Sequence, residues 1–321
     1  MARYVVVGAG TIGTLVAEQL AARGDRVTVV ARRGRGPAVA GVESVAADAA
    51  DERLVTRLAT GAEAIFNCAN PAYHRWPSDW PPIASSLLSS AEASGAVLVT
   101  LGNLYVYGAP SSPMSPDSAA RADFAKAQVR QRMWEDALAA HGAGRVRATE
   151  VRASDFIGPR ANGVFGPRQI PRILAGRSCR VIGSLDQPHS WTYVDDVAQT
   201  LITCADTDIA WGRVWHVATN PARTQRQLID DVAQVAGVGS VAASVIARRT
   251  LRIVGLVSPL VAELPTTLYQ FTAPFVIDDT ATRRALGLAP TPWPIVLART
   301  VDAYRAADRG DRATRPRGSR R

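Results

Sequence analysis

Short apolar runs alternate with segments of helical periodicity through the first half of the chain. Apolar runs of this length without polar alternation are typical of strands that are buried on both faces of a parallel sheet. Because parallel strands need crossover connections, we expect the intervening helices to cover both faces of the sheet. The pattern predicts an α/β fold built on a doubly wound parallel sheet. The predicted strands are 4–7, 26–31, 42–46, 62–69, 96–101, 145–152 and 213–218, and the clearest predicted helices are 81–94 and 119–141.

Three glycines, Gly8, Gly10 and Gly13, follow the first strand at G-x-G-x-x-G spacing, and a helical pattern starts within them at Thr11 and Ile12. The first glycine permits a tight turn, the second lets the backbone approach a pyrophosphate, and the third lets the helix pack against the strand. The helix start then offers free N–H groups and the positive end of its dipole to the phosphates. This order predicts a Rossmann dinucleotide site. A glycine turn needed only for packing is the alternative.

The end of the second strand decides which cofactor we expect. In a Rossmann domain, an acidic residue about 20 residues past the glycines usually binds the ribose 2′-hydroxyl of NAD. Here no Asp or Glu occurs between positions 26 and 43, and Arg32 and Arg33 stand in that place. Arginine would bind a 2′-phosphate, which a carboxylate would repel. The sequence therefore favours NADP over NAD, with a solvated basic turn as the alternative. Asp48, after the third strand, could reach the adenine amino group or cap the next helix.

The net charge of +9 does not by itself indicate nucleic-acid binding, because residues 309–321 alone supply +5 of it. That segment holds six arginines and one aspartate and has no apolar face. We therefore expect a disordered basic tail on an otherwise unremarkable globular body, and no nucleic-acid partner.

The cysteines and the apolar segments suggest a cytoplasmic location. Cys68, Cys179 and Cys204 have no metal-type spacing, so we expect reduced, buried thiols and no metal site. The most apolar late segment, 241–264, is interrupted by arginines and a proline and falls short of the ~18 apolar residues that a membrane helix needs. The chain enters its first strand directly, so neither a signal peptide nor a membrane partner is expected.

The later segments do not all continue the alternation. The run at 213–218 fits a further strand of the sheet, whereas the segments before and after it do not. We therefore assign residues 1–160 and 183–223 to the Rossmann domain. Residues 161–182 and 224–308 are assigned to a smaller C-terminal substrate lobe.

Several segments besides the glycine loop carry recognisable motifs. They are N-C-A-N at 67–70, L-Y-V-Y-G at 104–108, R-A-S-D-F-I-G-P at 152–159, W-T-Y-V-D-D-V-A at 191–198 and H-V-A-T-N at 216–220. With these motifs the chain, over most of residues 1–305, resembles the extended short-chain dehydrogenase/reductase superfamily, in its NAD(P)-dependent epimerase/dehydratase group. The resemblance implies that the segment ending at Asn70 passes behind the cofactor.

The catalytic residues of that family are replaced in this sequence. The family uses a Ser or Thr that orients the substrate, a Tyr that acts as acid and base, and a Lys four residues later that lowers the pKa of the Tyr. These positions fall on Asn103, Phe124 and Gln128. Phenylalanine cannot transfer a proton, and neutral glutamine cannot lower the pKa of a neighbour. The one lysine, Lys126, is expected to point about 200° around the helix from Phe124, so the usual relay is absent.

We expect the groups that replace the Tyr–Lys relay at the carboxyl edge of the sheet, where ligands bind in this fold. Tyr105 is favoured as the acid, with Asn103 holding the substrate oxygen. Tyr107 could also donate a proton, but the resemblance implies that it packs structurally. His74 and His189 are further candidates, and each could equally be a surface or loop histidine.

Two charged features have both a structural and a functional interpretation. Asp195 and Asp196 could be mistaken for a catalytic pair, but the resemblance places them at a helix start, where carboxylates cap free N–H groups. The loop at 158–172 contains Arg160, Arg168 and Arg172. It could bind a phosphate or carboxylate of a substrate, or be a solvated linker.

The sequence thus predicts an NADP-dependent oxidoreductase or epimerase-like enzyme that acts on a carbonyl or hydroxyl compound. Its non-standard active site would contain Asn103 and Tyr105. Tyr73, Trp76, Trp80 and Tyr105 predict an aromatic cleft for a small molecule, with a nucleotide sugar, a steroid and a quinone-like compound all left open. The missing Tyr and Lys also leave open a non-catalytic NADP-binding regulator or assembly factor. A homodimer is left open as well.

Overall fold

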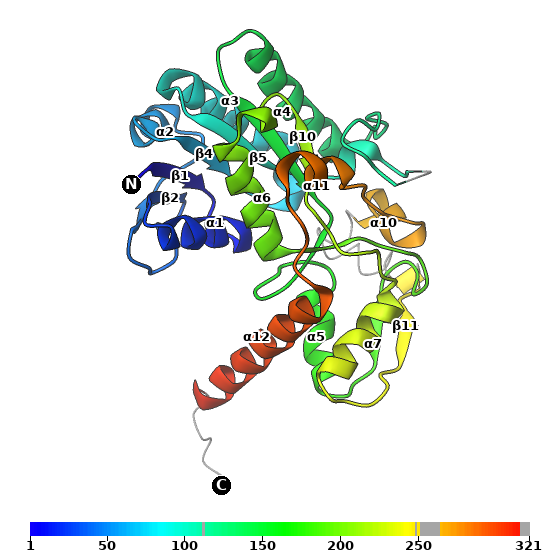
Figure 1. Ribbon diagram of the computed structural model, residues 1–321. Helices are drawn as coiled ribbons and strands as arrows, with labels where there is room; N and C mark the ends of the chain where they lie inside the picture. Colours follow the sequence, from blue (N-terminus) through cyan, green and yellow to red (C-terminus); the bar gives the residue numbers. More distant parts are fainter. Residues whose placement is uncertain (111–112, 248, 251–263, 315–321) are drawn as a thin grey trace.

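A seven-stranded parallel sheet forms the centre of the protein (Figure 1). The computed structural model describes the whole chain apart from residues 111–112, 248, 251–263 and 315–321. The strands of the sheet are β1 (Arg3–Val7), β2 (Arg26–Ala31), β3 (Val42–Ala46), β4 (Ala64–Asn67), β5 (Val97–Asn103), β6 (Ala148–Ala153) and β10 (Val214–His216). Their order is β10-β6-β5-β4-β1-β2-β3. The order reverses between β1 and β4, so a crevice for ligands is expected at the carboxyl ends of these two strands.

Helices cover both faces of the sheet, as predicted. One face carries α1 (Thr11–Ala22) and α6 (Val194–Asp206), and the other carries α2 (Glu52–Ala59), α3 (Trp76–Ser94) and α4 (Ala125–Gly142). Successive side chains of a strand point to opposite faces, and β1 shows this directly. Tyr4 and Val6 belong to the core beneath α1 and α6, whereas Val5 and Val7 belong to the core beneath the other three helices. The doubly wound architecture is therefore confirmed.

A smaller C-terminal region adjoins the sheet domain (Figure 1). It contains α5 (Gly166–Leu174), α7 (Gln225–Val235), α12 (Trp293–Thr314) and the two-stranded sheet of β8 (Cys179–Val181) and β11 (Ala243–Val245). Helix α7 begins with a capping box, in which Thr224 and Gln227 bond each other's backbone N–H. The chain boundaries proposed for this region, 161–182 and 224–308, stay a prediction.

Short elements connect the two regions. They are β7 (Asp155–Ile157), which pairs in parallel with β9 (Trp191–Tyr193), and the helices α10 (Tyr269–Thr272) and α11 (Thr280–Leu286). Strand β7 follows the end of β6 directly. The segments that leave the sheet therefore start at its carboxyl edge, beside the expected crevice.

Several predicted boundaries are wrong. Strands β1, β4, β5, β6 and β10 differ from the prediction by one to three residues at one or both ends, and three larger differences involve helices. Helix α3 starts at Trp76 rather than Pro81, because two buried tryptophans, Trp76 and Trp80, anchor its first turns despite the prolines. Helix α4 starts at Ala125 rather than Ala119. Helix α12 continues to Thr314, so the expected disorder does not begin at Arg309. The remainder of that tail, 315–321, lies outside the described residues.

Candidate active site

The glycine loop between β1 and α1 packs against the segment that follows β4. Gly8 has a left-handed φ of +106°, and a Cβ there would lie 2.5 Å from the carbonyl oxygen of Cys68. A Cβ on Gly13 would collide with the carbonyl of Gly8. These two glycines are therefore required by the fold itself.

Gly10 differs from both of its neighbours in the motif. Its backbone is extended, with φ −79° and ψ −173°, and a Cβ there would have nothing within 4 Å. Packing among the described residues therefore gives no reason for a glycine at this position. Open space in front of Gly10 is what a pyrophosphate cradle requires, because the phosphate oxygens must approach the backbone closely.

The N-terminus of α1 faces the same space. Gly10 is its N-cap, no side chain caps the first turn, and no acidic residue lies in that turn. The backbone N–H groups at Thr11 and Ile12 are thus suited to an anion. The Thr11 hydroxyl donates to the carbonyl of Arg160 at 2.6 Å. The loop that follows β7 therefore lies against the glycine loop.

The residues expected around the adenosine have different environments. Arg32 and Arg33 follow β2 and are exposed, as is Asn70 beyond β4. Asp48 is exposed and its Oδ1 accepts from the backbone N–H of Ala50. It is not the cap of α2, because Asp51 accepts from Leu54 at that position.

The register of the sheet brings the two substrate-side segments together. Asn103 at the end of β5 pairs with Ala153 at the end of β6, and Asp155 follows two residues later. The Oδ1 of Asn103 accepts from the backbone N–H of Tyr105 at 3.2 Å. The amide side chain of Asn103 therefore shapes the turn that presents Tyr105.

Tyr105 belongs to a cluster of half-buried aromatic rings. Its hydroxyl accepts a hydrogen bond from Tyr73 at 2.9 Å, and its ring lies 5.9 Å from that of Phe124 between centroids. The ring of Phe124 in turn lies 6.5 Å from that of Tyr269. Burial raises the pKa of Tyr105 well above 10, and Tyr73 and Asp155 add to the shift. The phenol therefore stays neutral and is suited to donate a hydrogen bond.

Trp76 and Trp80 are core residues rather than exposed lining of an aromatic cleft, although the ring of Trp76 lies 5.9 Å from that of Tyr105. Both are buried, and the guanidinium of Arg130 lies 4.7 Å and 4.2 Å from the centroids of their rings. Arg130 is itself buried, and its Nε has no hydrogen-bond partner in the described part of the chain. Burial lowers the pKa of this arginine to about 10. Sequence analysis missed it, although its spacing from Lys126 places both on one helix face.

The orientation predicted for Lys126 is wrong. Phe124 is the extended N-cap of α4, with φ −81° and ψ 148°, so helical periodicity does not relate the two side chains. Lys126 is buried, and its Nζ lies 4.5 Å from the centroid of the Tyr73 ring. Gln128 instead is exposed and donates to the carbonyl of Asp123. Lys126 therefore places a cation against Tyr73 in the aromatic cluster.

Tyr107 has a structural role, in agreement with the resemblance. It is buried, its hydroxyl lies 2.8 Å from Nε2 of His216, and it accepts from Arg152. Arg152 also forms a buried ion pair with Glu150 at 3.1 Å. Burial lowers the pKa of His216 to about 4, so this histidine is neutral.

The two remaining histidines that were candidates differ sharply. His74 is exposed in a short turn before α3. His189 is buried rather than a solvated loop residue, and its Nε2 lies 2.9 Å from Oδ2 of Asp155. Asp155 is the acidic residue of the R-A-S-D motif. Its carboxylate is the sequence feature that could have indicated a partner for His189, and it was not used above.

The other charged candidates are engaged in structural contacts. Arg160 pairs with Glu18 of α1 at 2.9 Å, and Arg172 donates to the carbonyl of Ser178. Asp196, in the first turn of α6, accepts from both the backbone and the hydroxyl of Thr291. No side chain caps α6, so Asp196 binds Thr291 rather than capping its own helix. Arg160 and Arg172 contact other parts of the protein, so neither is simply part of a solvated linker.

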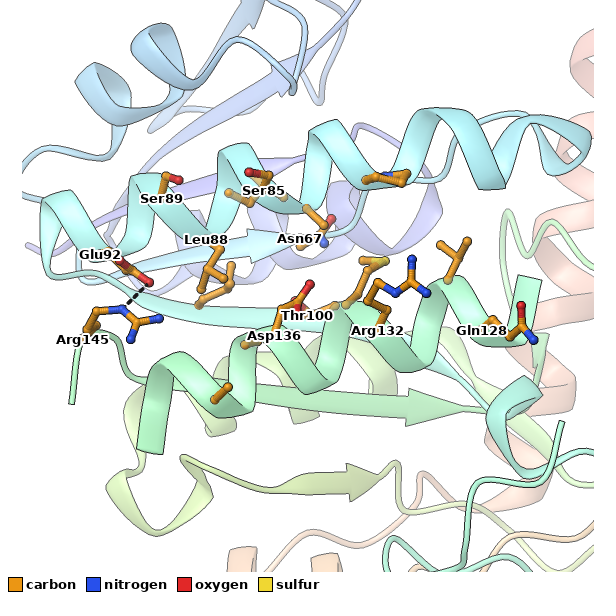
Figure 2. Close-up of a pocket in the computed structure, with 18 of the residues that line it drawn as sticks. Asn67, Ser85, Leu88, Ser89, Glu92, Thr100, Gln128, Arg132, Asp136 and Arg145 are labelled. Atoms are coloured by element: carbon orange, nitrogen blue, oxygen red, sulfur yellow. Dashed lines mark hydrogen bonds and ion pairs between the residues drawn. The ribbon is translucent and has the colours of Figure 1, made fainter. Parts of the chain in front are cut away.

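A cavity of about 610 Å³ lies between α3 and α4. Figure 2 shows Thr100 and Asn67 between the two helices and the ion pair of Arg145 with Glu92 at one end. Gln128 lines the opposite end. The cavity therefore lies on the α3 and α4 side of the sheet, and neither the glycine loop nor Tyr105 lines it.

The described residues include neither a membrane-spanning helix nor a cluster of metal ligands. None of the helices there is both long and apolar enough to cross a membrane, and the apolar stretch 241–264 lies partly outside those residues. No group of three or more His, Cys, Asp or Glu side chains in the described part of the chain is arranged to hold a metal ion. The three cysteines are buried and unbonded to each other.

A protein family and several solved structures are similar to this chain. The family model described as NAD dependent epimerase/dehydratase family matches residues 4–218. A dTDP-glucose 4,6-dehydratase from Streptomyces venezuelae, solved with NAD, has a TM-score of 0.78 at 21% identity, covering 96% of this chain and 98% of its own. A UDP-glucose 4-epimerase from Thermotoga maritima, solved with UDP-glucose, has a TM-score of 0.78 at 18% identity, covering 95% and 99%. None of the curated proteins matches the sequence.

Proposed function

Because the chain belongs to the NAD dependent epimerase/dehydratase family, we propose that it is an NADP-dependent oxidoreductase or epimerase-like enzyme with a non-standard active site. Its substrate is a carbonyl or hydroxyl compound. The family and the fold supply the nucleotide-binding half of this proposal. The residues at the carboxyl ends of β5 and β6 supply the other half.

The observation that carries the proposal is the open space in front of Gly10. A Cβ there would meet no described atom, although the two flanking glycines of the motif are fixed by packing. Thr11, Ile12 and Gly13 would hold the pyrophosphate through their backbone N–H groups, and Asn70 would border the cofactor. When bound, the nicotinamide supplies or accepts a hydride.

The preference for NADP rests on Arg32 and Arg33. Both are exposed after β2, where their guanidinium groups are available to a 2′-phosphate, and no carboxylate replaces them there. Asp48 would contact the adenine amino group. Three of the similar structures were solved with NAD, and this preference would distinguish the chain from them.

Tyr105 and Asn103 would hold the substrate oxygen. Both follow β5 at the carboxyl edge of the sheet, and Tyr105 is half-buried beside the rings of Tyr73 and Phe124. A neutral phenol that donates a hydrogen bond stabilises charge that develops on a carbonyl oxygen. Two of the similar enzymes act on nucleotide-linked glucose, and a nucleotide sugar is therefore one substrate class to test.

A non-catalytic NADP-binding regulator or assembly factor is the second candidate. Phe124 and Gln128 favour it, because neither can take part in the Tyr–Lys relay. The aromatic cluster around Tyr105 favours a bound small molecule and hence the enzyme.

One experiment separates the two candidates. NADPH and NADH binding is measured by calorimetry, and NADPH consumption is then followed with nucleotide sugars, ketosteroids and quinones. Binding together with turnover supports the enzyme. Tight binding without turnover on any of these compounds supports the regulator, and absence of binding contradicts both.

A further inference from the structure

His189 is held between two hydrogen-bond acceptors. Its Nδ1 lies 3.0 Å from the backbone carbonyl of Gln270, and its Nε2 lies 2.9 Å from Oδ2 of Asp155. A carbonyl can only accept, so Nδ1 must carry a hydrogen. A neutral imidazole would then present a bare nitrogen lone pair to the carboxylate. The second hydrogen bond therefore requires one more proton between His189 and Asp155.

Assigning hydrogens to the ring nitrogens of His216, the other buried histidine, gives the opposite result. Nδ1 of His216 lies 3.0 Å from the carbonyl of Asp278, so it too must donate. Its Nε2, however, faces the hydroxyl of Tyr107, which accepts from Arg152 and can donate its own hydrogen to the ring. Both ring hydrogen bonds of His216 can form while the imidazole is neutral. Both ring hydrogen bonds of His189 can form only if His189 and Asp155 share one additional proton.

Packing fixes the ring of His189 in this position. The ring stacks on Phe271 at 4.9 Å with an interplanar angle of 7°, and it also contacts Trp191 and Phe275. The ring is 2% exposed, whereas the side chain of Asp155 is 19% exposed. The pair therefore has a buried imidazole behind a carboxyl group that reaches solvent.

The exposed end of the pair faces the candidate substrate site. Asp155 follows β6 beside Asn103, and its charge contributes to the raised pKa of Tyr105. The nearby ionisable groups are Tyr105 after β5 and Tyr269 of α10, both phenols. Arg223, whose backbone pairs with His189, directs its guanidinium to Asp231.

We propose that Asp155 and His189 hold one exchangeable proton near Tyr105 and pass it to the oxygen of a bound carbonyl compound. The O–H bond forms on the ligand as its oxygen gains negative charge. The bond from that proton to Asp155 breaks, and the pair is left as a neutral imidazole and a carboxylate until water returns the proton. The transfer rests on the proposed function, whereas the proton itself is a property of the protein alone.

Nuclear magnetic resonance of the unliganded protein tests the proton directly. The chain has four histidines, so ¹⁵N-labelled side chains can be assigned by substitution. Near neutral pH we expect either a doubly protonated His189 with an ionised Asp155, or a neutral His189 with a protonated Asp155 in ¹³C spectra. His216 should be neutral in the same sample. A neutral His189 beside an ionised Asp155 would overturn the proposal.

The Asp155→Asn variant gives the matched comparison. Asparagine keeps the shape and can donate to Nε2, so His189 should become neutral with its hydrogen on Nδ1. His216 should be unchanged. Asp186→Asn removes an exposed carboxylate that pairs with Arg226 elsewhere, and it should leave both histidines as in the wild type.

Kinetics test the transfer to the ligand. On a carbonyl substrate, Asp155→Asn and His189→Gln should each lower kcat by about 100-fold or more without changing the affinity for NADPH. The wild-type rate should fall as rising pH removes the shared proton, and this dependence should be lost in Asp155→Asn. Wild-type turnover that survives Asp155→Asn refutes the transfer. If the wild type shows no turnover, the result contradicts the proposed function. The shared proton of Asp155 and His189 is then tested by the resonance measurement alone.

Discussion

The phenol oxygens of Tyr73 and Tyr105 lie 2.9 Å apart, with Tyr73 donating to Tyr105. The Nζ of Lys126 lies 4.5 Å from the centroid of the Tyr73 ring, next to Tyr105. In the usual relay the lysine acts on the catalytic tyrosine itself. This arrangement leaves the hydroxyl hydrogen of Tyr105 available to a ligand, because its oxygen is already an acceptor.

Removal of the Tyr105 hydroxyl should therefore lower turnover. Tyr105→Phe keeps the ring contacts, and we expect kcat to fall about 100-fold with little change in NADPH affinity or Tm. Asn103→Ala should lower kcat more than it raises KM. Tyr73→Phe, the control, removes only the donor and should have a smaller effect. Wild-type turnover by Tyr105→Phe would exclude this hydroxyl.

Gly10→Val should abolish NADPH binding without loss of the fold. The extended backbone at Gly10 accepts a branched residue, and the added atoms would enter the open space in front of the loop. Gly13→Ala should instead lower Tm, because its Cβ would collide with Gly8. Gly142→Ala, at the end of α4, should change neither property. Calorimetry and thermal unfolding of the three variants test this contrast.

Substitution of Arg32 and Arg33 by alanine should remove the preference for NADP. We expect the affinity for NADPH to fall by about 10- to 100-fold, or about 1.5–3 kcal/mol, while the affinity for NADH stays nearly unchanged. Titration of both cofactors against wild type and the double variant gives the result. Equal wild-type affinities for the two cofactors would show that the arginines form a solvated turn.

Restoration of the family's Tyr and Lys residues should not restore the usual relay. In Phe124→Tyr with Gln128→Lys, the new lysine would start from a position that lines the cavity between α3 and α4 (Figure 2). We expect less than about a threefold change in turnover of any nucleotide sugar, because a working general acid contributes about 10²–10⁴-fold. A gain of that size would show that position 128 reaches the active site.

The buried His216 should make the protein less stable in mild acid. Its pKa is about 4 in the folded state and about 6.5 when unfolded, so the unfolded chain binds the proton first. This contribution is complete above pH 6.5, is lost progressively as the pH falls from 6.5 to 4, and is fully lost below pH 4. At pH 5 the loss is about 2 kcal/mol in the free energy of unfolding. Urea unfolding of wild type and His216→Gln should show a weaker pH dependence in the variant.

The sequence alone determined the sheet, the helices on both of its faces and the glycine loop. Strands β2 and β3 begin and end as predicted. The apolar run of β2 is typical of a strand inside a parallel sheet, whereas β3 is the half-exposed edge strand and includes Glu43 and Ser44. The roles of Gly8 and Gly13 also followed from spacing, since local backbone geometry requires them.

Only the tertiary structure decided which polar side chains meet. Asp155 and His189 are 34 residues apart and come together because β7 pairs with β9. Lys126 turned toward Tyr73 because α4 begins one residue after Phe124, a boundary that periodicity does not define. Such contacts depend on packing between distant segments, and packing leaves no periodic signal in the sequence.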